Sequence, residues 1–412
     1  MMFLTQTTAM LVDAYRELNA RKLFWITLML SMLTAGAIAC VGINDKGISI
    51  LWWTISAEIF NTQYLSAATF YKTVFIQLGL KVWLTWIATV LALVSTASII
   101  PEFVAGGSIE LSLSKPVGRL RLFLTKYFTG LLFVTLQVAL FSAVCFLVIG
   151  IRGKVWEPVI FLSVPLVVLF FSYLYCICAL LGLITRSTIA ALLLTILFWF
   201  FLFLIHTGEQ SIRTLQLSAD IRLARADQAV GTLPDQMERG KKKIADLEKA
   251  PDDESDKAKA KRLSELSTEQ SRIAGMELRL QKMQTSSVDL RSTSGTLGKW
   301  HLGLLGVKSV LPKTAETIGV LERGLTSLDD FAKMREAQGD RIEQRREQRN
   351  QGRPEEERSA PGQGPAQIEM EAGEKLDAEN RSRSLWWVLG TSIAFETIVL
   401  GIACGIFARR DF

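Results

Sequence analysis

The sequence offers few residues that could carry out chemistry. It contains two histidines, His206 and His301, which give little material for a metal cluster or a Ser–His–Asp triad. The five cysteines all lie inside or at the ends of apolar runs: Cys40, Cys145, Cys176, Cys178 and Cys404. Cys176 and Cys178 point in different directions if they lie on a helix, which favours inert thiols over a metal or redox pair.

A phosphate-binding loop is also absent from the sequence. Nowhere does the pattern G-x-x-x-x-G-K-[ST] occur, and the nearest approach, SGTLGKW around Lys299, lacks the first glycine and the hydroxyl after the lysine. We therefore expect a chain that is not an enzyme, with no catalytic, cofactor-binding or metal-binding residues.

Two polar residues interrupt apolar runs, Gln137 and Glu396. A carboxyl at the middle of a membrane span costs a few kcal/mol and normally faces other helices. Glu396 can therefore belong to a substrate path or a proton-linked gate, or it can be a protonated group hydrogen-bonded to a neighbouring helix. The sequence leaves both interpretations open. Gly401 and Gly405 form a GxxxG pattern, a weak signal for close helix packing.

The most specific pattern lies in residues 101–126, between two long apolar runs. It begins with Pro101 and Glu102, continues with the pair Gly106 and Gly107, and then reads SIELSLSKPVGR. Its basic residues are Lys115, Arg119, Arg121 and Lys126. Short basic loops between membrane spans stay on the cytoplasmic side, so the sequence predicts a cytoplasmic loop here.

The order of these residues resembles the permease subunits of ABC-2 type transporters, including those grouped with multi-copper enzyme maturation systems. The residues that carry the resemblance are Pro101, Glu102, Gly107, Leu111, Leu113, Ser114, Lys115, Pro116 and Arg119. The resemblance covers the membrane portion, about half of the chain. Gly118 departs from the pattern, since this family has Ser there.

The resemblance implies a six-span permease that forms a homodimer or pairs with a related permease and is driven by a separate ABC ATPase, which binds the ATP. It also implies that the loop over 101–126 forms a short coupling helix that docks on that ATPase. The coupling residues would be Glu102, Gly106, Gly107, Lys115, Pro116 and Arg119. The substrate stays open among lipids, polysaccharides, small molecules and protein-derived elements. The alternative is a non-transport membrane scaffold that presents a coiled-coil insert to an envelope partner.

Composition supports a membrane protein without nucleic-acid binding. The chain is 50% hydrophobic with a mean hydropathy of +0.28, although 21% of its residues are charged. Residues 207–384 hold 31 basic and 31 acidic residues, so the net charge of +6 belongs to the apolar remainder, where it reports orientation. Ten basic residues in the expected cytoplasmic segments against five outside favour both termini inside. The resemblance implies that the membrane is a bacterial cytoplasmic membrane.

Hydrophobic periodicity predicts an all-α membrane protein. We expect an amphipathic interfacial helix over 5–20 and further helices at the outer interface within 42–81, anchored by Trp52 and Trp53. The six apolar runs long enough to span a membrane are 23–41, 82–100, 128–150, 159–184, 188–205 and 385–407.

The polar stretch 207–384 is expected to be an extracytoplasmic insert between a membrane domain over 1–206 and a last span with a cytoplasmic C-terminus over 385–412. A coiled-coil hairpin is predicted over 213–285, broken at Pro251: its first part has apolar residues at loosely helical spacing, and its second part has Leu266, Ile273 and Leu280 at sevenfold spacing. A helix is expected over 311–334. The Gln-, Glu-, Gly- and Pro-rich composition of 335–380 predicts a disordered tether.

Overall fold

A computed structural model describes residues 22–45, 47–56, 66–105, 118–249, 256–325, 344, 347–348 and 365–409. The expected interfacial helix over 5–20 lies outside these residues. The chain divides into two compact units. Unit 1 comprises Met1–His206, Val307–Gln351 and Arg383–Phe412, and unit 2 comprises Thr207–Gly306 and Gly352–Ser382. Within the stretch expected as an insert over 207–384, the described residues 307–325 fall in unit 1.

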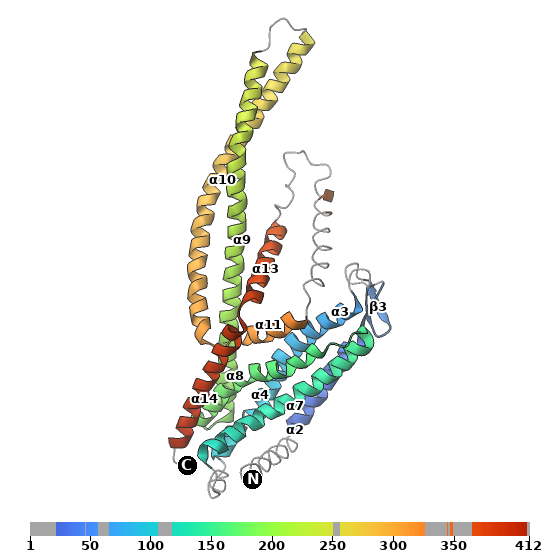
Figure 1. Ribbon diagram of the computed structural model, residues 1–412, viewed down its shortest axis with the longest axis vertical. Helices are drawn as coiled ribbons and strands as arrows, with labels where there is room; N and C mark the ends of the chain where they lie inside the picture. Colours follow the sequence, from blue (N-terminus) through green and yellow to red (C-terminus); the bar gives the residue numbers. More distant parts are fainter. Residues whose placement is uncertain are drawn as a thin grey trace. The chain divides into compact units, whose positions relative to one another are not determined.

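Six helices within the described ranges are long and apolar enough to cross a membrane, as expected for a multi-pass membrane protein. They cover Lys22–Cys40, Ala67–Val104, Arg119–Gly153, Pro158–Thr185, Thr188–Glu248 and Trp386–Arg409. Their elements are α2 (Lys22–Cys40), α3 (Ala67–Val74), η1 (Phe75–Ala88), α4 (Thr89–Thr96), α5 (Ile99–Ala105), α7 (Arg119–Gly153), η2 (Pro158–Leu162), α8 (Ser163–Thr185), α9 (Thr188–Glu248), η4 (Trp386–Gly390) and α14 (Thr391–Arg409). Figure 1 shows α2, α7 and α8 side by side.

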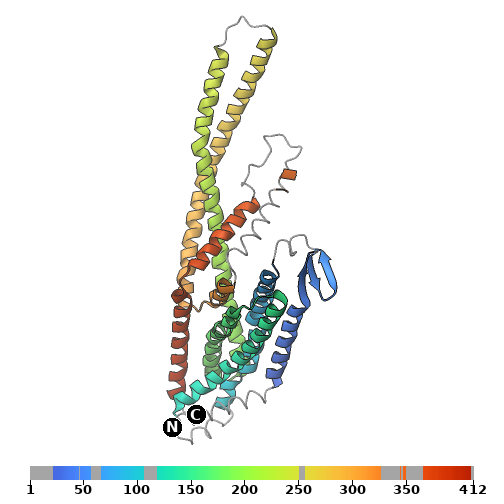
Figure 2. The ribbon, with the colours of Figure 1, turned by 45° about the vertical axis from the view of Figure 1, so that its right-hand side comes forward.

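The expectation of interfacial helices after the first span is wrong for its first part. Residues after α2 form a three-stranded antiparallel sheet of β1 (Val41–Asn44), β2 (Gly47–Ile50) and β3 (Trp53–Ser56), visible beside the end of α2 in Figure 2. Each strand contains β-branched residues, such as Ile43, Ile48 and Ile55, and these favour strands because branched side chains fit a pleated surface. Helix resumes at α3, where the Ser66 hydroxyl accepts a hydrogen bond from the Thr69 amide.

The second span is therefore longer than predicted at both ends. It includes η1, a π-helix, and after a break at Ala97 and Ser98 it continues as α5 to Ala105. Pro101 does not end the helix, because it lies in the first turn of α5, where a missing N–H is tolerated. Its ring packs so closely on α8 that a Cβ at Gly182 would lie 3.0 Å from Pro101 Cγ.

The core of unit 1 is centred on α8, which contacts α7, α14 and other elements. An apolar surface all round a helix requires burial on every side, and Phe170, Phe171, Tyr173 and Tyr175 of α8 are all buried. The Tyr175 ring stacks on Tyr127 of α7 with centroids 5.1 Å apart. The close crossing depends on Gly130 of α7, where a Cβ would lie 2.6 Å from the Tyr175 ring.

In unit 2 the stretch for which a hairpin is expected, 213–285, lies on two long helices. Its helices are α9, from residue 207 onward, and α10 (Asp256–Val310), up to residue 306. They are joined by ion pairs, including Lys243 to Glu269 at 2.7 Å and Arg291 to Asp227 at 3.0 Å.

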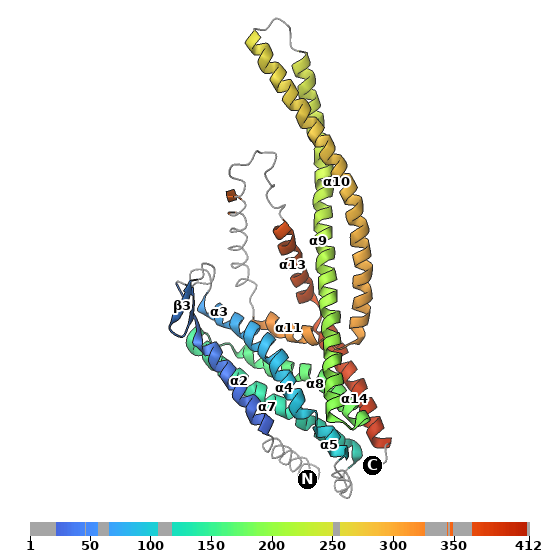
Figure 3. The ribbon, with the colours of Figure 1, turned by 180° about the vertical axis from the view of Figure 1, so that it is seen from behind.

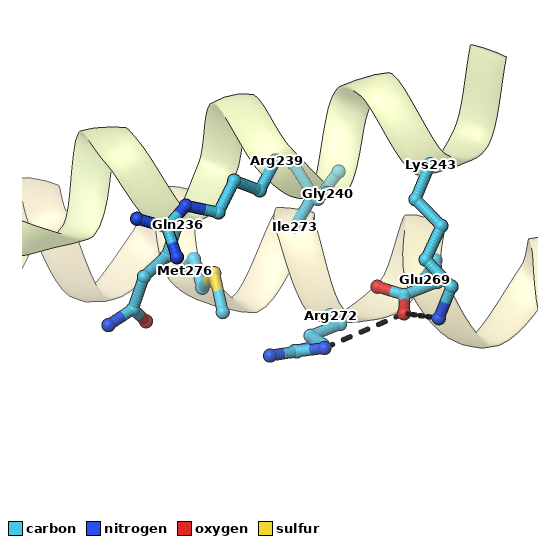
Figure 4. A pocket seen from close by; sticks show the side chains of 8 residues that line it. All are labelled: Gln236, Arg239, Gly240, Lys243, Glu269, Arg272, Ile273 and Met276. Carbon is cyan, nitrogen blue, oxygen red and sulfur yellow. Dashed lines mark hydrogen bonds and ion pairs between the residues drawn. The ribbon is translucent and has the colours of Figure 1, made fainter. Parts of the chain in front are cut away.

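A groove of about 420 Å³ lies between these two helices (Figure 4). At this point Gly240 of α9 allows Ile273 of α10 to approach, since a Cβ on Gly240 would lie 3.2 Å from Ile273 Cδ1. The Lys243 hydrogen bond holds the pKa of Glu269 below its ordinary value. These contacts fix the register of the two helices.

The prediction of a disordered tether over 335–380 is wrong for its last part, because α13 (Pro365–Ser382) is a helix. Ile368 and Ala372 of α13 are buried against Leu217 and Ile221 of α9, in the part of α9 that belongs to unit 2. Further support comes from ion pairs of Arg213 with Glu379 and of Arg225 with Glu371.

The helix expected over 311–334 is described as α11 (Thr314–Leu325). Its buried face, which includes Thr317, Ile318 and Leu321, contacts α8, η1, η2 and η4. A pair of Lys81 on η1 with Glu322 at 3.0 Å holds its second half. This helix therefore belongs with the apolar helices of unit 1.

Candidate functional site

The predicted coupling-loop residues fall partly within the described structure. Gly106, Gly107, Lys115 and Pro116 lie outside it. Glu102 is exposed in the first turn of α5, and Arg119 is the first residue of α7. Glu102 therefore lies on the helix before the loop, and Arg119 lies on the helix after it.

Both sides of this loop pack on the end of α14. The Phe407 ring is buried between Phe103 of α5, with centroids 6.3 Å apart, and Phe123 of α7, with centroids 5.4 Å apart. Arg119 Nη1 donates a hydrogen bond of 3.3 Å to the carbonyl oxygen of Ala408. We call these five residues the loop-end cluster. Figure 3 shows α5 and the end of α14 at the same end of unit 1.

Glu396 lies on α14, near the middle of the apolar helix Trp386–Arg409, and it is half-buried within this chain. Tyr127 of α7 donates a hydrogen bond of 2.9 Å from its hydroxyl to Oε1, and Ser172 of α8 donates one of 2.9 Å from its Oγ to Oε2. Tyr127 is almost fully buried, so the carboxyl is reached by donors from two neighbouring helices. Glu396 is thus hydrogen-bonded to α7 and α8, and both interpretations considered from the sequence are compatible with these bonds.

The second intramembrane polar residue, Gln137, does not meet Glu396. It is buried on α7, ten residues after Tyr127, which is about 15 Å along the helix axis. In the described part of the chain its Nε2 has no hydrogen-bond partner. Gln137 therefore lies apart from the Glu396 hydrogen bonds.

The glycines of the GxxxG pattern are Gly401 and Gly405. A Cβ added at either position would have no atom of a neighbouring described element within 4 Å.

A buried ion cluster lies at the other end of unit 1. Glu316 of α11, 7% exposed, binds Lys308 through Oε1, and the same oxygen lies 3.5 Å from Arg383 Nη1 and 3.5 Å from His206 Nδ1. Burial alone would raise the pKa of Glu316, but the His206 hydrogen bond and the Lys308 charge outweigh it and hold this pKa well below its ordinary value. We call these four residues the Glu316 cluster.

Lys313 lies beside this cluster and is also buried. Its Nζ donates to Thr391 Oγ1 at 2.5 Å and to the Ser309 carbonyl at 3.2 Å, and it lies 4.5 Å from the centre of the Trp387 ring. Burial lowers the pKa of Lys313 to about 8, against the opposing charge of Glu316. The start of α11 is thereby tied to η4 and α14.

Sequence reasoning did not find the Glu316 cluster or the partners of Glu396. The cluster draws on residues from α9, α10, α11 and the segment before η4, and no local spacing reveals such a set. One signal was present, because Lys308, Lys313 and Glu316 stand among apolar residues. Charged residues in such a setting are expected to be paired.

Comparison with known proteins gives no match: no family model, no curated protein and no solved structure is similar to this chain.

Proposed function

We propose that this chain is the permease subunit of an ABC-2 type transporter, which moves a substrate across a membrane with energy from a separate ATPase. The proposal rests on the residue pattern over 101–126 and on six helices able to span a membrane. It includes a homodimer or a pair with a related permease, in a bacterial cytoplasmic membrane with both termini inside.

The loop-end cluster is the observation that carries the proposal. A loop that receives force from an ATPase must be joined mechanically to the spans. Phe103 before the loop and Phe123 after it both contact Phe407, so a displacement of the loop would act on α14 from two sides. Because α14 also binds α7 and α8 through Glu396, the displacement would reach the middle of the spans.

A reconstituted complex with the cognate ATPase tests this assignment. Glu102→Arg and Gly107→Val should abolish the stimulation of ATP hydrolysis by the permease while leaving it inserted. Arg121→Gln is the matched control, because a basic residue beside the membrane binds anionic headgroups with about 1 kcal/mol and should affect only yield. Unchanged ATPase stimulation and unchanged co-purification in both loop variants would remove the main support for a transporter.

Orientation is tested separately. The basic residues predict that a reporter active only in the cytoplasm works when fused after Phe412 and fails when inserted near Pro251. The opposite result would place the loop on the side without ATP and exclude coupling.

The second candidate is a scaffold that presents unit 2 to an envelope partner. It is favoured by the separate compactness of unit 2, whose three helices hold their own apolar contacts and ion pairs. Co-purification from native membranes with an envelope protein and without any ATPase would favour this function over transport.

A further inference from the structure

Glu396 has an unusual set of hydrogen-bond donors, because each of them has a second acceptor within reach. The Tyr127 hydroxyl lies 2.9 Å from Glu396 Oε1 and 3.1 Å from the carbonyl oxygen of Ser172. The Ser172 hydroxyl lies 2.9 Å from Glu396 Oε2 and 2.8 Å from the carbonyl oxygen of Leu169. Each hydroxyl has one proton, so each can serve only one acceptor at a time in a good geometry.

The two acceptors per donor allow two fully bonded arrangements. When Glu396 is a carboxylate, both hydroxyls donate to it. When Glu396 is protonated, its Oε2–H can donate to Ser172 Oγ, while the Ser172 proton turns to Leu169 O and Tyr127 keeps its bond to Oε1. No donor is left without an acceptor in either state, so neither state suffers the cost of an unpaired buried polar group.

No neighbouring cation among the described residues fixes the Glu396 carboxyl in its ionised form. In the described residues, the groups that interact with the Glu396 carboxyl are the hydroxyls of Tyr127 and Ser172, and no cation forms an ion pair with it. The titratable groups on the adjoining described helices that interact with the Glu396 charge are Tyr127 on α7 and Tyr173 and Cys176 on α8, and Tyr175 stacks on Tyr127.

These groups are all neutral at ordinary pH. On the side of η4, Lys313 binds Thr391, five residues before Glu396. A carboxylate fixed by an adjacent arginine or lysine would stay ionised, and Glu396 has no such partner among these neighbours.

We propose that Glu396, with Tyr127 and Ser172, is a proton-binding site inside the apolar region of the protein. The carboxylate takes one proton from the aqueous phase and releases it again, with the Ser172 hydroxyl exchanging acceptors at each step. A static structural carboxyl needs only one of the two arrangements. The proposal concerns this chain alone and does not depend on the transport function.

The test is infrared difference spectroscopy of the full chain in phosphatidylcholine vesicles, from about pH 4 to pH 9. The carbonyl stretch of a protonated carboxyl should appear as the pH falls and be lost in Glu396→Gln. Glu322→Gln is the matched control, because this carboxyl lies on α11 in a partly exposed pair with Lys81 and should leave that band unchanged.

Two milder variants keep the test decisive if Glu396→Gln folds poorly. Ser172→Ala and Tyr127→Phe each remove one donor and should move the midpoint of the band by about one pH unit. A Glu396 band that is present at every pH, or absent at every pH, overturns the proposal. A midpoint that stays the same in both donor variants also overturns it. Failure of the ATPase experiment would leave this result untouched, since no ATPase is used.

Discussion

Replacement of the buried carboxylate Glu316 by Gln should open α11. The substitution keeps the shape of the side chain but removes the negative charge that Lys308 and Arg383 share. Lys308 is 4% exposed and cannot regain its water when the partner is lost. Breaking a buried ion pair by removing one partner costs about 3 to 5 kcal/mol, because a buried charge is left uncompensated.

The matched control is Glu322→Gln on the same helix. Its partner Lys81 lies 3.0 Å away, but the two side chains are 41% and 28% exposed. Such pairs contribute about 0 to 1 kcal/mol. The two variants therefore differ in burial and not in the type of charge removed.

Hydrogen exchange of the α11 amides in the purified protein measures the difference. If α11 opens locally, a loss of about 3 kcal/mol accelerates its exchange by about a hundredfold or more, and the control changes it by about fivefold at most. Equal acceleration in the two variants would refute the reasoning that burial decides the energy.

The same assay has a defined pH dependence. The pKa of Glu316 is lowered in the folded protein, so its stabilisation is complete above its ordinary value and is lost as the pH falls through the folded value. The difference between the protein and Glu316→Gln should therefore stay constant above about pH 5 and shrink at more acidic pH.

Three further substitutions test other contacts. Gly130→Ala should destabilise the α7–α8 crossing by about 1 to 3 kcal/mol in thermal unfolding, since its Cβ would lie 2.6 Å from the Tyr175 ring, whereas Gly405→Ala should be neutral. Ala372→Asp should abolish the hydrogen-exchange protection of α13, because it places an unpaired charge at a fully buried position. Burial lowers the pKa of Lys313 to about 8, so the buried charge of this side chain costs stability below pH 8. As the pH rises from about 7 to 10 the charge is lost, and thermal unfolding should show a gain in stability relative to Lys313→Met.

The helices able to span a membrane could be predicted because each needs about 20 consecutive apolar residues, a pattern that few other structures produce. The hairpin prediction rested on helical and sevenfold spacing of apolar residues. The sheet after α2 could not be separated from a helix, since short apolar runs of isoleucine and glycine carry little periodicity. In α13 the apolar face holds only Ile368, Ala372 and Leu376, and the surrounding composition concealed it.

The candidate site was predictable only in part. Glu396 was evident as a carboxyl within an apolar run, but its partners lie 269 and 224 residues earlier in the chain. The Glu316 cluster likewise joins residues separated by up to 177 positions, from His206 to Arg383. Such contacts depend on how helices pack, and one sequence contains no direct record of that packing.

The alternative acceptors of Tyr127 and Ser172 also have a consequence for biosynthesis. The helix α14 is made after α7 and α8, so these two helices must wait in the membrane without Glu396 while about 200 residues are added. During this interval the Tyr127 hydroxyl can donate to the Ser172 carbonyl and the Ser172 hydroxyl to the Leu169 carbonyl. In an assembly intermediate without α14 these two hydroxyls therefore keep an acceptor, and they are already placed to receive the carboxyl when α14 arrives.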